Sequence, residues 1–165
     1  RIAAGSSLMK LFLMRHGIAE PFGIKPDEQR ILTERGRTLV AAQFKACASE
    51  LSIEQIIHSP YQRTTETAQI GAQLLNVKTL VSDERLTPEA DIQLALELLE
   101  TYADIPTLYV THNPFVGRLI GLLCEGSSRF AEPMDTGMLA AIETDWPASG
   151  LGRLIWKRPV PGSAF

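Results

Sequence analysis

The sequence predicts an α/β protein: a three-layer α/β/α sandwich built on a mostly parallel central sheet of about six strands. Two patterns lead to this fold class. Short apolar and β-branched runs alternate along the chain with longer segments of helical spacing. Two of these runs lead directly into residues that start helices, which is typical of strand–helix units whose strands lie parallel. The length of 165 residues fits one domain, which we expect over residues 9–165.

Six short runs predict strands because they are apolar or β-branched and are bounded by glycine, proline or polar residues. The runs 10–14 and 107–111 are almost wholly apolar or β-branched, so both are expected to be buried on two faces. In chain order, the predicted strands are residues 10–14, 55–58, 77–81, 107–111, 138–142 and 154–156.

Four segments between these strands predict helices. Thr33 is a candidate N-cap for the first helix, and Ser59, followed by Pro60 and Gln62, has the residues of a capping box for the second. The third helix is predicted by the helical spacing of its apolar residues, and Asn113 with the proline after it is a cap signal for the fourth. In chain order, the predicted helices cover about residues 33–49, 60–75, 91–102 and 114–124.

Composition narrows the class of protein. Hydrophobic residues make up 45% and charged residues 21%, and no apolar run approaches the ~20 residues of a membrane span. The 16 Lys and Arg against 19 Asp and Glu give a net charge of −3, so we expect no nucleic acid and no membrane as partners. Cys47 and Cys124 are expected to be buried thiols in a reducing, cytoplasmic compartment. Met9 is a plausible native start, so residues 1–8 are expected to be a cloning remnant or a disordered extension.

Arginine and histidine side chains gather at the ends of three predicted strands. Arg15 and His16 follow the first strand, Arg63 lies in the first turn of the helix after the second, and His112 follows the fourth. Because ligands of open α/β sheets bind outside the carboxyl ends of the strands, we expect these side chains to meet at one edge, near two helix N-termini. The sequence therefore predicts an anion site, and the planar guanidinium group suits phosphate oxygens best.

Two histidines give this anion site a catalytic use. One ring nitrogen can attack phosphorus when the other is held by a hydrogen bond that fixes the tautomer, which gives a phosphohistidine intermediate. The arginines would stabilise the charge that develops on the phosphoryl oxygens. We expect no metal and no cofactor, because the guanidinium groups supply the positive charge and the sequence contains no glycine-rich phosphate loop and no H-E-x-x-H motif.

Three motifs resemble those of the histidine phosphatase superfamily, which is also called phosphoglycerate mutase-like. Residues 15–17 resemble its R-H-G signature, residues 59–68 resemble its second motif, S-P-x-x-R-(T/A)-x-x-T, and residues 111–114 resemble its third. They occur in the family's order, and the resemblance extends over essentially the whole chain from Met9. It implies a phosphoglycerate mutase-like fold and phosphatase activity.

Within the superfamily, the chain is most similar to the small SixA-type phosphohistidine phosphatases. Residues 30–36 are similar to the R-x-L-T-x-x-G segment of that group, and residues 86–88 match its L-T-P. His16 and His112 are only 112 − 16 = 96 residues apart, so the insertion that covers the pocket in mutases and sugar-phosphate phosphatases is missing. The resemblance therefore implies an open pocket for a bulky phosphorylated protein.

The resemblance assigns roles to the strand-end residues. His16 would be the nucleophile, and Arg15, Arg63 and His112 would bind the phosphoryl group with it. Glu84 would be the general acid that protonates the leaving group, although a solvated turn carboxylate is an equally good interpretation.

Three further polar residues lie close in sequence to the motifs or to Glu84 and are not assigned a main role in catalysis. Asp83 stands beside Glu84 and is a competing candidate for the acid. Arg30 is a candidate for the rim of the pocket, although an ordinary surface residue before a helix is the better interpretation. We expect His58 to be structural or to lie at the rim of the pocket.

Three functions fit the sequence. The first is a metal-free phosphatase that hydrolyses phosphohistidine on a protein through a covalent intermediate on His16. The second is a phosphomonoesterase for a small phosphorylated metabolite, which would need a stronger leaving-group acid at Glu84. The third is a phospho-ligand binding module without turnover. The expected partner is accordingly a phosphorylated protein or a small phosphorylated molecule.

Overall fold

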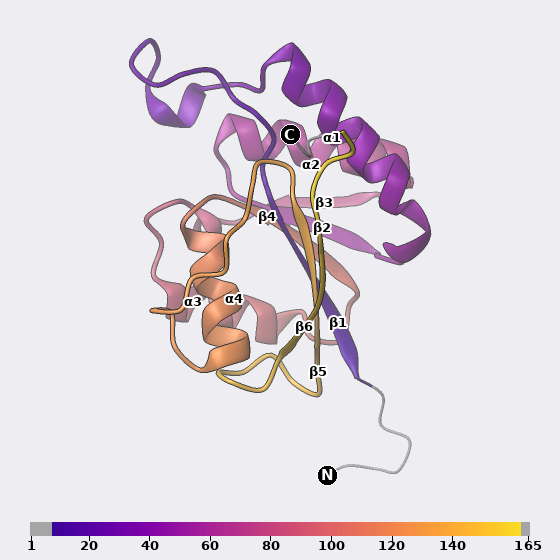
Figure 1. Ribbon diagram of the computed structural model, residues 1–165, viewed down its shortest axis with the longest axis vertical. Coiled ribbons are helices and arrows are strands. Elements are labelled where there is room, and N and C mark those ends of the chain that lie inside the picture. The colour runs from indigo at the N-terminus through magenta and orange to yellow at the C-terminus, as the bar shows by residue number, and fades with distance from the viewer. Residues whose placement is uncertain (1–7, 163–165) are drawn as a thin grey trace.

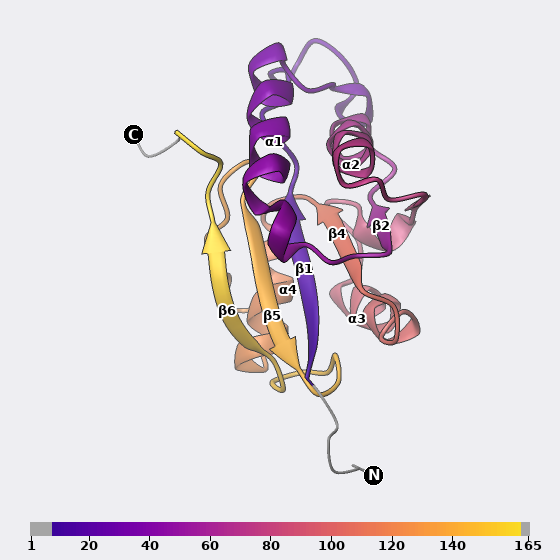
Figure 2. The same cartoon turned by 90° about the vertical axis from the view of Figure 1, so that its right-hand side faces the viewer.

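The sheet runs through the middle of the molecule, and two helices cover each of its faces (Figure 1, Figure 2). The computed structural model describes residues 8–162, so the extension expected at residues 1–8 lies outside the described residues except for Leu8. The predicted three-layer α/β/α sandwich with a mostly parallel sheet is confirmed.

Every predicted strand is present. In chain order the strands are β1 (Met9–Arg15), β2 (Gln55–His58), β3 (Thr79–Ser82), β4 (Thr107–Thr111), β5 (Leu139–Thr144) and β6 (Arg153–Arg158). They lie in the order β3–β2–β4–β1–β5–β6. The first four in that order are parallel, and β5 is antiparallel to both β1 and β6. The carboxyl ends of β1, β2 and β4 therefore meet at one edge of the sheet.

Every predicted helix is also present. Within residues 8–162 the four α-helices are α1 (Glu34–Cys47), α2 (Gln62–Leu75), α3 (Ile92–Thr101) and α4 (Phe115–Glu125). In the same range, three short 3-10 helices cover Asp27–Gln29, Ala48–Glu50 and Glu84–Leu86. No helix among residues 8–162 is long and apolar enough to cross a membrane.

The alternation of side chains along each strand divides the core into two parts. In β1, Leu11 and Leu13 pack toward α3 and α4, while Phe12 and Met14 pack toward α1 and α2. All four side chains are at most 4% exposed. Because both faces of the sheet are covered, the central strands need apolar residues at every position, which explains the continuous apolar runs in the sequence.

Two predicted helix caps are wrong. The N-cap of α2 is Tyr61 rather than Ser59, and that of α4 is Pro114 rather than Asn113; neither N-cap side chain accepts a hydrogen bond. Thr33 does cap α1 as predicted, since its Oγ1 accepts from the Gly36 N–H (2.9 Å). The two mispredicted residues use their side chains in the strand-end loops instead.

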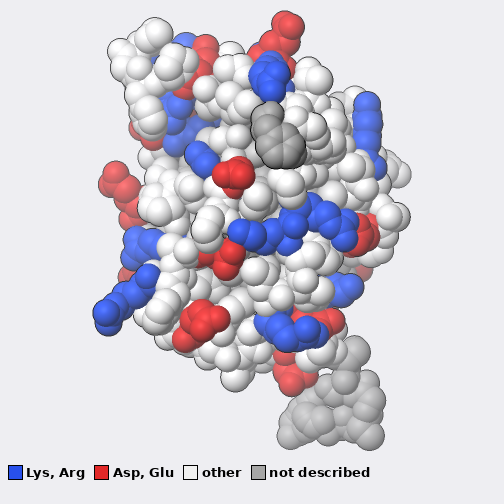
Figure 3. Space-filling model, in the orientation of Figure 1, with Lys and Arg blue, Asp and Glu red and all other residues white. Residues whose placement is uncertain are grey.

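The surface in Figure 3 carries positive and negative side chains interspersed, with neither sign covering this face. That distribution agrees with the small net charge of −3.

Candidate active site

Three strand ends bring His16, His112 and Arg63 together. The N–H of His16 donates to the carbonyl oxygen of Thr111 (3.1 Å), which ties the end of β1 to the end of β4. The two imidazole rings are neighbours, with centroids 5.4 Å apart and planes at 64°. Arg63 reaches them from the first turn of α2, where its Nε donates to His16 Nε2 (3.2 Å). Three of the predicted site residues therefore form one cluster.

The backbone fixes the tautomer of His16. Its Nδ1 lies 2.7 Å from the carbonyl oxygen of Gly17, which can only accept, so Nδ1 carries the ring hydrogen. The lone pair of Nε2 then accepts the hydrogen bond from Arg63 Nε. Burial, together with the charges of Arg63 and Arg15, lowers the pKa of His16 to about 3. The ring is therefore neutral near pH 7, as a nitrogen nucleophile must be.

Glycine is needed at position 17 because the backbone there packs closely against α1 and leaves no room for a side chain. A Cβ there would lie 2.5 Å from Val40 Cγ2 and 3.3 Å from the Gly36 carbonyl oxygen. The Gly17 N–H donates to Thr67 Oγ1 in α2 (3.2 Å). The segment after His16 is thus held between α1 and α2, which positions the carbonyl oxygen that orients the imidazole ring.

Ser59 holds the second histidine. Its Oγ forms a hydrogen bond with His112 Nε2 (2.8 Å), and the Tyr61 ring packs edge-on against the imidazole with centroids 5.0 Å apart. His112 is 1% exposed, and its Nδ1 is buried without a hydrogen-bond partner among residues 8–162. Burial, followed by the neighbouring His16 and Arg63, lowers the pKa of His112 to about 2. A buried, unpaired ring nitrogen beside His16 is suited to contact an added ligand.

Arg63 is 3% exposed and is paired with Asp27. Its Nη1 donates to the carbonyl oxygen of Asp27 (2.7 Å) and its Nη2 to Asp27 Oδ2 (3.2 Å). Burial lowers the pKa of Arg63, and the Asp27 carboxylate opposes that shift. With the bond to His16, three of its five N–H groups are engaged, and two have no hydrogen-bond partner among the described residues.

Arg15 approaches the cluster from another side. Its Nη1 donates to the Met134 carbonyl oxygen (3.0 Å), which also accepts from Asn113 Nδ2 (3.1 Å). Its Nε is buried without a partner among the described residues. Burial lowers the pKa of Arg15, Asp135 opposes that shift, and the charge of Arg63 adds to it. The side chain is therefore close enough to affect the cluster electrostatically but forms its hydrogen bond with the loop before β5.

The prediction that Arg30 is an ordinary surface residue is wrong. It is 6% exposed, and its Nε donates to Asp27 Oδ1 (2.8 Å) while its Nη1 donates to the Glu20 carbonyl oxygen (2.5 Å). The Phe22 ring covers one face of the guanidinium, with Cζ 3.8 Å from the ring centroid. The charge of Arg30 contributes to the low pKa of both histidines. Arg30 is thus a third guanidinium beside the cluster.

The two acid candidates differ in their contacts. The Asp83 carboxylate accepts three hydrogen bonds from Arg85, at 2.8–2.9 Å, so it is already engaged. Glu84 is exposed and lines a cavity of about 540 Å³ together with Tyr61, whose ring packs on His112. Glu84 therefore borders the site through Tyr61 and forms no hydrogen bond with either histidine in the described chain.

Sequence reasoning missed Asp27 and gave Ser59 the wrong partner. Asp27 lies in an irregular segment three residues before Arg30, and only the folded segment brings it to Arg63. Ser59 stood inside the second motif, but its S-P-x-Q pattern matched a helix cap. His58, expected to be structural or at the rim, is 5% exposed, with Nδ1 2.7 Å from the Ser59 carbonyl oxygen.

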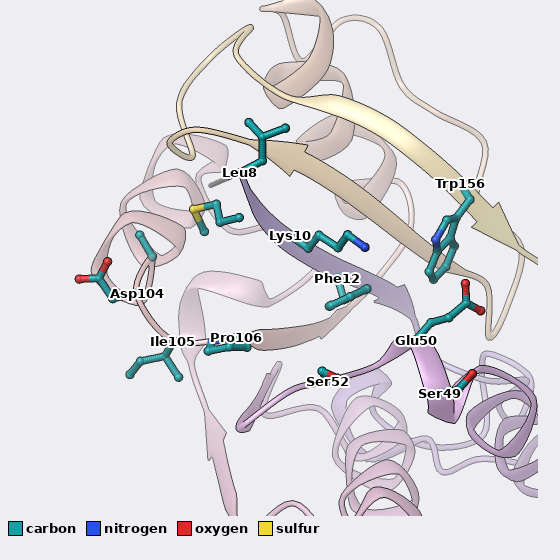
Figure 4. A pocket seen from close by; sticks show the side chains of 12 residues that line it. Leu8, Lys10, Phe12, Ser49, Glu50, Ser52, Asp104, Ile105, Pro106 and Trp156 are labelled. Carbon is teal, nitrogen blue, oxygen red and sulfur yellow. The ribbon is translucent and has the colours of Figure 1, made fainter. Parts of the chain in front are cut away.

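A second cavity lies at the opposite end of the sheet and is separate from this cluster. It has a volume of about 510 Å³ and is lined by residues such as Lys10, Phe12, Pro106 and Trp156, which lie near the start of β1 and β4 and on β6 (Figure 4). None of the predicted site residues lines it. Within residues 8–162, no three or more His, Cys, Asp or Glu side chains are grouped so that they could hold a metal ion.

Comparisons with known proteins agree with the geometry. The histidine phosphatase superfamily (branch 1) model matches residues 11–92. Phosphohistidine phosphatase SixA of Escherichia coli (strain K12) is 31% identical over 157 residues, covering 90% of this chain and 92% of that protein. The structure of the protein histidine phosphatase SixA complexed with tungstate matches with a TM-score of 0.77 and 28% identity, over 90% of this chain and 96% of that one.

The chain belongs to the histidine phosphatase superfamily. Its similarity to SixA in sequence and structure makes it a phosphatase of this fold. A mycobacterial glucosyl-3-phosphoglycerate phosphatase has the same fold at 17% identity, with a TM-score of 0.70 over 90% of this chain and 98% of that one. The resemblance read from the three motifs is thereby confirmed.

Proposed function

We propose that this chain hydrolyses phosphohistidine on a protein, without a metal ion, through a covalent phosphoryl intermediate on His16. The observation that carries the proposal is the fixed tautomer of His16. Its Nδ1 hydrogen is bound to the Gly17 carbonyl oxygen, and its Nε2 lone pair lies beside the Arg63 guanidinium. A neutral ring held in this way has one nucleophilic nitrogen next to a group that binds phosphate.

The reaction has two displacement steps. The hydrogen bond from Arg63 Nε to His16 Nε2 opens, and the freed Nε2 lone pair attacks phosphorus while the bond between phosphorus and the substrate nitrogen breaks. The leaving imidazole takes up a proton from water. A water molecule then attacks the phosphorus on Nε2 and gives up a proton to solvent, the P–N bond to His16 breaks, and inorganic phosphate leaves. The proton stays on Nδ1 and remains hydrogen-bonded to the Gly17 carbonyl oxygen. This bond stabilises the positive charge that the ring carries while it is phosphorylated.

Positive groups around Nε2 stabilise the transition state. Arg63 contributes its two free N–H groups, and Arg15 contributes the field of its charge and its unpaired Nε. When the Ser59 hydroxyl donates to His112 Nε2, Nδ1 of His112 carries the hydrogen and can donate to a phosphoryl oxygen. The charge comes from side chains that are already in place, so little reorganisation is needed during the reaction.

The relatives support phosphohistidine as the substrate. SixA of Escherichia coli, 31% identical, is a phosphohistidine phosphatase, and the SixA structure with 28% identity holds tungstate, a tetrahedral oxyanion like phosphate. An imidazole leaving group is protonated more readily than an alkoxide. A site whose acid candidate, Glu84, is exposed and forms no hydrogen bond with the histidines is therefore better matched to a phosphoramidate than to a phosphate ester.

The proposal is tested by comparing phosphate release from phosphohistidine proteins and from phosphorylated metabolites. We expect faster turnover of the phosphohistidine proteins and a fall of at least about a thousandfold in His16→Asn. Thermal unfolding of this variant shows whether it is folded. Preferred hydrolysis of a metabolite ester would instead support the phosphomonoesterase, and equal rates in wild type and His16→Asn would exclude His16 as the nucleophile.

A further inference from the structure

Asp27 connects the two buried guanidinium groups of the site. It begins the short helix Asp27–Gln29 in the segment between β1 and α1. Its Oδ1 accepts from Arg30 Nε (2.8 Å), and its Oδ2 accepts from Arg63 Nη2 (3.2 Å). Its backbone oxygen accepts from Arg63 Nη1 (2.7 Å). One residue therefore makes three contacts with the arginines beside His16.

These contacts fix the orientation of the Arg63 guanidinium relative to His16. The guanidinium is planar, so holding Nη1 and Nη2 on Asp27 fixes the direction of the remaining Nε–H. That group points at His16 Nε2, 3.2 Å away. A guanidinium without the two Asp27 contacts could rotate about its side-chain torsions, and its Nε–H would no longer be held in line with His16 Nε2.

Asp27 also reduces the repulsion between the two arginines. Arg30 and Arg63 are 6% and 3% exposed, and the charge of Arg30 lowers the pKa of Arg63. The Asp27 carboxylate, whose side chain is 41% exposed, places one negative charge between the two guanidinium groups. Arg30 is in turn fixed by the Phe22 ring and by the Glu20 carbonyl oxygen. The segment before α1 therefore supplies the contacts that hold both guanidinium groups.

The surroundings of Asp27 exclude it as the leaving-group acid. Burial alone would raise its pKa, but the hydrogen bond from Arg30 and the charge of Arg63 outweigh that effect and lower it. The carboxyl group is thus ionised near neutral pH and has no proton to donate. Its contribution must come from the groups that it holds.

We propose that Asp27 is a positioning residue for phosphoryl transfer, which acts by aligning the Arg63 guanidinium with His16 Nε2. The inference rests on the proposed function, because it assigns Arg63 to the reacting phosphoryl group. It adds a residue outside the three motifs, on the segment between β1 and α1.

The test uses Asp27→Asn and two readouts, hydrolysis of p-nitrophenyl phosphate and competitive inhibition by inorganic phosphate. Losing a charge-assisted hydrogen bond that acts in the transition state is expected to lower kcat about tenfold. KM and the inhibition constant of phosphate should stay within about twofold, because removing a negative charge does not weaken attraction to an anion. Weaker phosphate binding together with a lower unfolding temperature would show a merely structural role and overturn the proposal.

A matched control and a double variant complete the test. Glu28→Gln removes the neighbouring charge of the same short helix and should leave kcat within about twofold, because the Glu28 side chain forms no hydrogen bond or ion pair with Arg63 among residues 8–162. If Asp27 acts through the Arg63 guanidinium, Asp27→Asn should lower kcat by at most about twofold when it is introduced into the Arg63→Lys variant. An equal loss in both backgrounds would overturn the proposal.

The outcome is separable from that of the proposed function. The assay uses a small ester, so it does not depend on which phosphorylated protein is the substrate. If phosphohistidine proteins are not hydrolysed but Asp27→Asn shows the expected effects on p-nitrophenyl phosphate, only the substrate proposal fails. If phosphohistidine is hydrolysed and Asp27→Asn behaves like wild type, only the role of Asp27 fails.

Discussion

Lowering the pH from 7 to 5 should destabilise the free protein strongly, because both site histidines are neutral when folded. The pKa of His16 is lowered from 6.5 to about 3 and that of His112 from 6.5 to about 2, with burial as the first cause in each case. Below pH 6.5 the unfolded chain binds a proton on each of these histidines, while the folded chain does not. The free energy of unfolding therefore falls as the pH falls through this range.

The size of the effect follows from the same values. Each histidine that titrates only in the unfolded state reduces the free energy of unfolding by about 1.4 kcal/mol per pH unit well below pH 6.5. Integrated from pH 7 to pH 5, the loss is about 2 kcal/mol for each histidine and about 4 kcal/mol for the pair. Their exposed fractions, 7% and 1%, give little reason to reduce this value for solvent screening.

Urea unfolding at pH 7 and pH 5, in buffer without phosphate, measures this loss. Because His112→Asn removes one of the two groups, its loss of unfolding free energy over the same pH range should be about 2 kcal/mol smaller than that of wild type. Carboxylates with lowered pKa, such as Asp27 and Asp83, affect both proteins alike. The same loss in wild type and variant would refute the conclusion that His112 is held neutral.

Three substitutions test single contacts. Ser59→Ala removes the partner of His112 Nε2, so we expect a loss of about 1–3 kcal/mol in urea unfolding and a fall of about tenfold in kcat; an unchanged kcat would show that the hydrogen bond does not orient the ring. Gly17→Ala places a Cβ 2.5 Å from Val40 Cγ2 and should cost about 1–3 kcal/mol of stability, whereas a neutral substitution would mean that the α1 contact yields easily. Glu84→Gln should lower ester hydrolysis about a hundredfold but leave phosphoramidate hydrolysis within about twofold if Glu84 is the acid; an unchanged ester rate would exclude that role.

The strands and helices were predictable because their signals are local. The continuous apolar run in β1 and the spacing in α3 and α4 depend only on which faces are buried. The order of strands in the sheet depends on contacts between distant segments, and no residue pattern encodes it directly. The motifs that follow β1 and β4 indicated that the ends of these strands meet at one edge of the sheet. They did not indicate that the two strands are direct neighbours.

The caps show where local rules fail. Ser59 and Asn113 have the residue types of N-caps, yet neither is the N-cap of its helix. The Ser59 Oγ accepts the Tyr61 N–H (3.3 Å) and also bonds to His112, and Asn113 donates to the Met134 carbonyl oxygen. Local propensity is a weak guide where a side chain has a stronger partner elsewhere.

Segment 17–31 explains what else the sequence did not show. It is irregular, so neither periodicity nor capping places Asp27 or Arg30. Burial of Arg30 depends on the Phe22 ring and the Glu20 carbonyl oxygen, contacts that form only when the segment folds over the strand ends. The histidine pair was predictable from motifs, whereas the carboxylate that supports Arg63 required the structure.

The central claim, a covalent intermediate on His16, is tested most directly by trapping it. Wild type is mixed with a phosphohistidine protein, quenched rapidly in alkali, where phosphohistidine is stable, and mapped by peptide mass spectrometry. We predict phosphate on the peptide that contains His16, formed before inorganic phosphate is released, and none on that peptide in His16→Asn. Turnover without any phosphate on His16, or with the phosphate on His112, would contradict the mechanism.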